Sequence, residues 1–444
     1  MSGRSVELPD IPGAGDELED YVAALFQASG HYVEKQVVES DPADLLELDI
    51  VTTDYAREEA PRRLVPPRRL VEVKGGSWGY TDLFKVVGWM QYLKIPRSAF
   101  FITRWDDRGT APRRMEPLGL DVVCFEDFNT APKHFTEKGF GAFTEPELID
   151  LWRHSYGVER KLIKLIHKRA KAGDEGARAA KTYHRQINNG TFFARAPEES
   201  LAMLYEAYGE HPKLTRGYAD ELDGGTYDPQ SETSSSVSYR SMMFDGKHPE
   251  LQACTYLEHR ARLSILKSAV DYALAHPDGG PEFRMSEDRK VFTFQGLTYH
   301  ALPATFHNGM EWLREQPNFC RYATFWQQLL WGWGGFYLDD REEQEFEWMS
   351  RYSGIPADEI PTALEAFDRF FPIPGGWFVT AGETDVRMVK MVPWVLQGIG
   401  AHHRRCQYKL SKESGFSGLN PSSRYTHSDL GKRVNCTVDF LLDQ

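Results

Sequence analysis

The chain has 444 residues, of which 41% are hydrophobic and 13% aromatic, which excludes a disordered protein and suffices for about two to three domains. Its formal net charge of −13 excludes a uniformly basic nucleic-acid-binding protein, so any nucleic-acid contact must come from local clusters of Lys and Arg. The sequence contains no apolar run long enough for a membrane span, no signal-peptide pattern and five widely spaced cysteines, so we expect a soluble, cytoplasmic protein with reduced thiols and no membrane partner.

The first 130 residues alternate helix-like and strand-like periods, which is typical of an α/β domain. Apolar residues at helical spacing predict a helix from about Asp16 to Gly30, where a glycine ends it. Strands are predicted at 31–39, 47–52, 70–74, 99–103 and 120–125, with a helix at 81–93 between the third and the fourth. We therefore expect a mixed sheet flanked by helices over residues 1–130.

The rest of the chain divides into three predicted regions. Residues 131–214 are helical and basic, because the stretch from Arg153 to Arg185 has ten Lys or Arg against three acidic residues. Residues 215–250 have few large aliphatic side chains and are interpreted as a linker or long loop. Residues 251–444 are predicted to be a mainly helical, aromatic-rich region, with helices at 251–275, 310–333, 342–352 and 363–371. Its aromatic cluster, Trp326, Trp331, Trp333, Phe336 and Tyr337, is expected in a buried core.

One predicted strand places a carboxylate and an amine on the same face. In the run LVEVK at residues 70–74, strand alternation directs Glu72 and Lys74 to one face and the two valines to the other. Asp49, in the preceding predicted strand, lies beside Glu72 if the two strands pair. Two adjacent carboxylates repel each other unless a cation lies between them, and a divalent cation is what phosphodiester hydrolysis requires. Mg²⁺ is the expected cation and Mn²⁺ the alternative, with Lys74 acting on the attacking water and Glu19 reaching the same or a second metal ion.

The pattern acid-x-Lys alone does not identify this site, because it occurs four times, at 72–74, 159–161, 245–247 and 288–290. Only Glu72 and Lys74 lie in an apolar strand that has an acidic strand before it and a helix and a strand after it. The context, rather than the tripeptide, therefore selects this occurrence.

Four segments together resemble the restriction-endonuclease-like, or PD-(D/E)XK, nuclease superfamily, in particular its Mrr-like and Holliday-junction-resolvase-like members. They are GDELE at 15–19, GHYV at 30–33, LDIV at 48–51 and VEVKG at 71–75. The resemblance implies that Asp49 and Glu72 bind the metal, that Lys74 is catalytic and that Glu19 assists as a metal ligand and catalytic residue. Leu48 stands where the superfamily's name has Pro, and the Gln-x-x-x-Tyr motif of RecB-like nucleases is absent. The resemblance covers the N-terminal domain only.

Ten basic residues are candidates for nucleic-acid binding, because the planar guanidinium of arginine can contact a phosphate at two points. Arg62, Arg63, Arg68 and Arg69 precede the strand of Glu72, and Arg104, Arg113 and Arg114 follow the strand at 99–103. Lys161, Lys164 and Lys168 lie in a predicted basic helix that is equally interpretable as a solvated face. We expect both arginine groups to border the site, since loops at strand ends commonly carry binding residues.

The sequence therefore predicts a Mg²⁺-dependent endonuclease, with double-stranded DNA as the expected substrate. The resemblance to Mrr-like nucleases suggests a restriction or anti-phage defence role. Two alternatives remain open: a nuclease for RNA or branched DNA, and a catalytically inactive nuclease fold that binds nucleic acid or scaffolds a complex. Cleavage of both strands favours a homodimer, and the C-terminal region is a candidate surface for a protein partner.

Overall fold

The computed structural model describes most of the N-terminal half of the chain and the helical core of the C-terminal half. The described residues are 14–39, 46–55, 66–105, 108–126, 130–143, 148–173, 175–188, 197, 199–204, 249–277, 284–285, 291–294, 297–300, 304–332, 335–338, 342–371, 378–380 and 386–389. No helix within these ranges has the length and apolar character needed to cross a bilayer.

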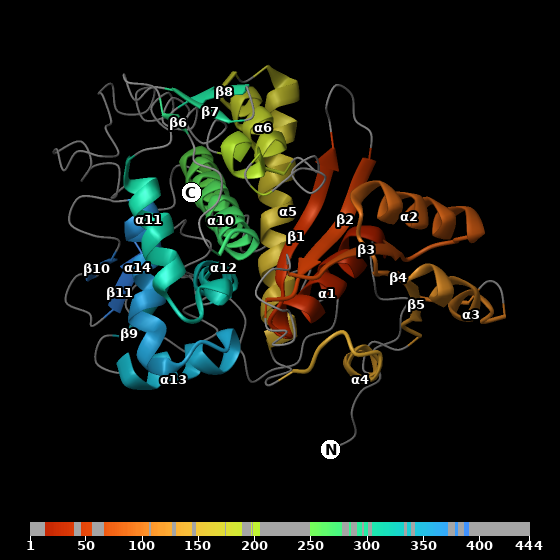
Figure 1. Ribbon diagram of the computed structural model, residues 1–444. Helices are drawn as coiled ribbons and strands as arrows, with labels where there is room; N and C mark the ends of the chain where they lie inside the picture. The colour runs from red at the N-terminus through yellow and green to blue at the C-terminus, as the bar shows by residue number, and fades with distance from the viewer. Residues whose placement is uncertain are drawn as a thin grey trace.

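A five-stranded mixed sheet forms the centre of the N-terminal region, as the sequence predicts (Figure 1). Its strands are β1 Tyr32–Glu39, β2 Leu46–Thr53, β3 Arg68–Lys74, β4 Ser98–Ile102 and β5 Leu120–Cys124. They lie in the order β1-β2-β3-β4-β5. The pairs β1–β2 and β2–β3 are antiparallel, and the pairs β3–β4 and β4–β5 are parallel. The predicted α/β class is therefore confirmed at the level of architecture.

Helices cover both faces of this sheet, and each face has its own apolar core. Helix α1 (Ala14–Ala28) packs on one face against Val71, Val73 and Phe101, and helix α2 (Tyr80–Leu93) packs on the other face against Leu70 and Phe100. The predicted N-terminal helix and the helix at 81–93 are both confirmed. Consecutive residues of β3 thus alternate between two buried cores, as a strand covered on both faces requires.

The remaining described residues are mostly helical. The longer helices are α4 Ala131–Glu137, α5 Leu148–Ala172, α6 Glu175–Ile187, α10 Pro249–Ala275, α11 Ala304–Glu315, α12 Tyr322–Gln327, α13 Glu342–Ser353 and α14 Ile360–Phe370. Two short three-stranded sheets, which the sequence did not predict, accompany them. They consist of β6 Arg284–Met285, β7 Val291–Phe294 and β8 Leu297–His300, and of β9 Phe336–Leu338, β10 Phe378–Thr380 and β11 Val386–Val389. Most of the predicted linker, residues 215–248, lies outside the described residues.

The single helix predicted over residues 310–333 is wrong, because the chain breaks there into several short elements. Helix α11 ends at Glu315, a 3₁₀ turn at Phe319–Arg321 follows, and α12 continues into a π-helical turn at Gln328–Gly332. Pro317 explains the break, since proline lacks the amide hydrogen that a continuing helix needs and restricts the residue before it.

The α1 face of the sheet and the helical region share one continuous apolar core. This core extends from α1 through α5 and α10 to α14, and it buries Trp326, Trp331 and Tyr337, which confirms their predicted place in a core. The side chains of Trp333 and Phe336 lie outside the described residues. Figure 1 shows α5 and α10 between the sheet and the outer helices, whereas α2 and α3 (Ala111–Met115) lie on the side of the sheet away from them.

Candidate active site

Asp49 and Glu72 come from neighbouring strands at the point where the pairing between these strands ends. The β2–β3 ladder runs from Thr53 and Arg68 to Ile50 and Val71, so Asp49 and Glu72 follow as the next opposing positions. The Val73 amide donates its hydrogen bond to the side chain of Asp49 rather than to a backbone carbonyl. Its nitrogen lies 2.8 Å from Oδ2 of the Asp49 carboxylate. This bond holds the Asp49 carboxylate against the backbone of β3, next to Glu72.

The alternation of buried side chains in β2 slips at Asp49. Leu48 packs in the α2-side core and Ile50 in the α1-side core, although a regular strand directs residues two apart to the same face. In the neighbouring strand, the pairing skips Gln36, the residue opposite Asp49, and the φ of Gln36 is +50°. Asp49 therefore lies at a local distortion of two strands, which re-aims its side chain as β-bulges do near functional sites.

Glu72 and Lys74 lie together on the same face of β3, as predicted. Nζ of Lys74 is 3.0 Å from Oε1 of Glu72, and the Glu72 residue is only 3% exposed. Oε2 of Glu72 is buried and has no hydrogen-bond partner among the residues that the structure describes. A buried carboxylate oxygen without a donor is costly, so this oxygen is available to a cation.

The electrostatics of the site reflect two carboxylates crowded in a poorly solvated place. Burial raises the pKa of Asp49 to about 8, with further contributions from the negative charges of Glu72 and Glu19. Burial disfavours the charged form of Lys74, but the hydrogen bond and charge of Glu72 and the charge of Asp49 outweigh it and raise the pKa of this ammonium. Lys74 thus remains a cation beside a pair of carboxylates that a divalent ion would stabilise.

Glu19 lies on α1 and acts on Asp49 through its charge, as the pKa effect shows. Even so, no three His, Cys, Asp or Glu side chains in the described ranges are grouped closely enough to hold a metal ion. The described geometry therefore brings Asp49 and Glu72 together but does not assemble the predicted three-carboxylate set with Glu19. Mg²⁺ still fits this donor set, since it commonly binds one or two protein carboxylates and takes its other ligands from water and phosphate oxygens.

The described residues of the two predicted arginine groups lie at opposite ends of the strands of the sheet. Because β3 and β4 are parallel, with Lys74 opposite Ile102, the chain segments that carry Arg104, Arg113 and Arg114 leave the sheet at the same edge as Lys74. Arg68 and Arg69 start β3, and Arg68 is four residues, about 13 Å, from Glu72 along the strand. The expectation that both groups border the site is therefore corrected for Arg68 and Arg69, which lie at the far end of β3, whereas the group after β4 lies on the Lys74 side. Arg62 and Arg63 lie outside the described residues.

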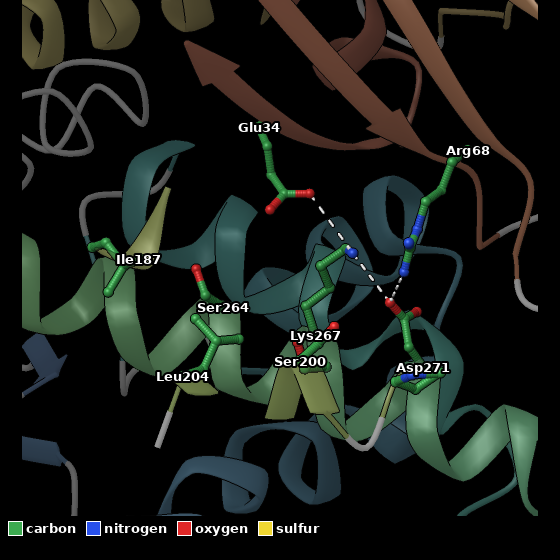
Figure 2. Close-up of a pocket in the computed structure, with 10 residues that line it drawn as sticks. Glu34, Arg68, Ile187, Ser200, Leu204, Ser264, Lys267 and Asp271 are labelled. Atoms are coloured by element: carbon green, nitrogen blue, oxygen red, sulfur yellow. Dashed lines mark hydrogen bonds and ion pairs between the residues drawn. The ribbon is translucent and has the colours of Figure 1, made fainter. Parts of the chain in front are cut away.

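Arg68 and Arg69 have structural partners instead. Arg68 forms an ion pair with Asp271 of α10, with Nη2 at 2.6 Å from Oδ2, and the Arg69 guanidinium stacks over the ring of Phe140 at 4.5 Å. Figure 2 shows Lys267 of α10 between Glu34 of β1 and Asp271 of α10, with Arg68 of β3 also paired with Asp271. Arg68 thus joins the sheet to the helical region rather than a solvent-facing basic surface.

The basic helix predicted around Lys164 and Lys168 is confirmed as α5, and both side chains are exposed. Helix α5 packs against α1, on the face of the sheet opposite α2 (Figure 1). Glu72 faces the α2 side, because its strand neighbours Val71 and Val73 belong to the α1-side core. The fold therefore does not bring these two lysines to the side of the sheet on which Glu72 lies. The side chain of Lys161 lies outside the described residues.

The residues that order the site's edge were not singled out from the sequence. The hydroxyl of Thr103 donates to the carbonyl of Gly75 at 3.2 Å, and the indole of Trp78 donates to the carbonyl of Arg104 at 2.9 Å. The only sequence signal for this loop was its composition, GGSWG at 75–79, directly after Lys74.

No protein-family model, curated protein or solved structure matches this chain.

Proposed function

We propose that this protein is a metal-dependent nuclease that hydrolyses phosphodiester bonds, with Asp49, Glu72 and Lys74 at its active site. One observation carries the proposal. Asp49 and Glu72 are the next opposing positions of two adjacent strands, a buried Glu72 oxygen has no hydrogen-bond partner among the described residues, and the Lys74 amine is 3.0 Å from the other oxygen. A solvent-exposed ion pair on a strand, which is the structural alternative, would not bury Glu72 in this way.

The two carboxylates are the residues that would hold the metal. Bound there, a divalent cation supplies charge stabilisation to a phosphate and acidifies a water molecule. The Val73 amide keeps Asp49 oriented toward β3, and Glu72 holds the Lys74 ammonium in place. The Lys74 side chain is 34% exposed, so it can contact a phosphate that approaches from solvent. Double-stranded DNA is the substrate that we propose, with RNA and branched DNA as alternatives to be compared.

The proposal is tested by incubating the protein with plasmid DNA and Mg²⁺ or Mn²⁺, and then repeating the assay with Asp49→Asn, Glu72→Gln and Lys74→Met. Each substitution preserves side-chain size and removes one charge. We expect a loss of cleavage of about 100-fold or more for each, the size typical for removal of a group that stabilises transition-state charge. Linear duplex, branched DNA and RNA substrates, assayed in parallel, identify the preferred nucleic acid.

Two matched variants control for nonspecific effects. Glu47→Gln removes an exposed carboxylate from the same strand as Asp49, and Lys138→Met removes an exposed amine. Both should cleave as the unmodified protein does. Equal cleavage by the active-site variants would refute the proposal. Binding of nucleic acid without cleavage, and without a Mn²⁺ site that calorimetry detects and Asp49→Asn abolishes, would favour a binding or scaffolding protein.

A further inference from the structure

Two loops form a single surface next to Lys74, at the C-terminal ends of the parallel strands β3 and β4. The loop after β3 and the loop after β4 leave the sheet side by side, because these strands are parallel. The two bonds described above, from Thr103 to Gly75 and from Trp78 to Arg104, tie the loops together. We define the active-edge surface as residues 75–80 and 108–114 together with Thr103 and Arg104.

The active-edge surface presents exposed cations. Arg113 and Arg114 of α3 are exposed, and neither forms an ion pair with a carboxylate in the part of the chain that the structure describes. The Arg114 guanidinium lies 5.4 Å from the centre of the Tyr80 ring, and the Tyr80 hydroxyl is 2.9 Å from that of Thr110. These contacts orient Arg114 without neutralising it.

Nearby acidic groups do not cancel this charge within the described residues. Asp82 accepts a hydrogen bond from the amide of Gly79 at the start of α2, and its charge acts on Lys74. Asp106 and Asp107 belong to the loop before α3 and lie outside the described residues. Glu116, directly after α3, is exposed as well, but no ion pair joins it to Arg113 or Arg114 among the described residues. Arg108, five residues before Arg113, adds a further exposed cation.

Gly76 adds a second feature to the active-edge surface. Its φ is not positive, it is exposed, and a Cβ built on it would meet no atom within 4 Å. The fold itself therefore does not require glycine at this position. Glycine is also used where a ligand must approach the backbone closely, and Gly76 lies two residues after Lys74.

From these observations we infer that the nucleic-acid backbone crosses the active-edge surface, where Arg113 and Arg114 bind phosphates beside the scissile one and Gly76 lets the strand pass close to the protein backbone. This inference rests on the nuclease function proposed above and adds the direction from which the substrate reaches the site. The arginines at the start of β3 have no part in it, since Arg68 is held by Asp271.

The test measures binding of a fluorescent DNA duplex in EDTA, so that no cleavage occurs, at several salt concentrations. Each phosphate contact contributes about 0.9 to the slope of log K against log salt, so the double variant Arg113→Gln and Arg114→Gln should reduce this slope by about 2. Gly76→Val should weaken binding while leaving the thermal unfolding midpoint unchanged. Single-stranded DNA and duplex RNA, measured alongside, show which form of the backbone the surface prefers.

Two control variants match these changes. Arg97→Gln removes an arginine that is 61% exposed at the opposite end of β4, and Gly88→Ala changes an exposed glycine on α2 that also has no atom near its missing Cβ. Both should bind as the unmodified protein does. An unchanged salt slope in the double arginine variant, or unchanged affinity in Gly76→Val, would overturn the inference, as would the absence of binding by the unmodified protein.

The outcomes also separate this inference from the proposed function. If the protein cleaves DNA and the arginine variants bind with the original salt slope, the nuclease proposal stands and the active-edge surface is excluded. If the protein binds DNA through Arg113 and Arg114 but does not cleave it with any divalent metal, the nuclease proposal fails and the surface is retained.

Discussion

The side chain of Gln327 pairs with the backbone of Val33 as a neighbouring strand would. The Val33 amide donates to Oε1 of Gln327 at 3.0 Å, and Nε2 of Gln327 donates to the Val33 carbonyl at 2.7 Å. Nearby, Asn188 accepts the amide of Val38 through its backbone carbonyl and donates to the carbonyl of Lys35 through its side chain. The helical region thus satisfies the free edge of β1, which would otherwise expose unpaired backbone groups.

Replacement of Gln327 by Met tests this edge pairing. The variant keeps the side-chain volume but leaves a buried amide and a buried carbonyl of Val33 without partners, each of which costs about 1–3 kcal/mol. We expect the free energy of unfolding to fall by about 2–4 kcal/mol, measured as a lower denaturation midpoint in urea. Gln91→Met, at an exposed position of α2, is the control. A midpoint equal to that of the control would show that the pairing contributes nothing.

The ion pairs around Asp271 predict an effect of similar size. Asp271 is 2% exposed and accepts from Tyr55, Arg68 and Lys267, and these cations and hydrogen bonds hold the pKa of its carboxyl below the usual value despite burial. Asp271→Ala leaves the buried Lys267 and the partly buried Arg68 without this carboxylate. Breaking a buried pair typically costs 3–5 kcal/mol, so we expect a loss of about 3 kcal/mol. Urea unfolding measures it.

An exposed ion pair provides the comparison for Asp271. Asp121 lies 3.4 Å from the exposed Arg97, and exposed pairs contribute about 0–1 kcal/mol. Asp121→Asn should therefore shift the unfolding midpoint very little. Similar losses of unfolding free energy in Asp271→Ala and Asp121→Asn would contradict the prediction that burial makes the Asp271 ion pairs contribute more to stability.

His184 on α6 predicts a dependence of stability on pH. Burial, together with the positive charges of Arg260 and His167, lowers the pKa of His184 to about 3. The unfolded chain, in which a histidine has a pKa of about 6.5, therefore binds a proton that the folded protein excludes. The contribution of the neutral His184 to the free energy of unfolding is fully present above pH 6.5. It is lost as the pH falls from there toward 3, by about 1.4 kcal/mol per pH unit.

Unfolding midpoints of the unmodified protein and His184→Gln, compared at neutral pH and near pH 5, measure this contribution. The variant has no group to protonate at this position, so its stability should fall less between the two conditions. Parallel losses in the two proteins would indicate that His184 does not set the acid sensitivity.

Two glycines predict opposite effects of the same substitution. Gly119 has a φ of +78°, and a Cβ there would collide with the carbonyl oxygen of Pro96, so Gly119→Ala should destabilise the protein by more than 1 kcal/mol. Gly88 is exposed within α2 and has open space around it, so Gly88→Ala should stabilise the helix by up to about 1 kcal/mol. Thermal unfolding measures both, and shifts of the same sign would contradict the prediction.

The sequence alone determined the local elements of the N-terminal region and the residues that β3 places together. Strand alternation depends only on neighbouring residues. The position of Glu72 and Lys74 on one face of the strand therefore followed from the sequence of residues 70–74 alone. The apolar runs located the five strands and the first two helices within one or two residues. Between residues 310 and 333, in contrast, the apolar pattern predicts one helix, whereas Pro317 breaks it.

Only the tertiary structure decided which distant segments meet. The sequence could not show that the parallel pairing of β3 and β4 places Arg104 at the Lys74 end of the strands, that the alternation of β2 slips at Asp49, or that Gln327 completes the edge of β1. Each depends on strand pairing and on contacts between residues far apart in the chain, which local periodicity does not encode. The separation of the two arginine groups, and with it the surface open to a substrate, is therefore a property of the fold rather than of the sequence pattern.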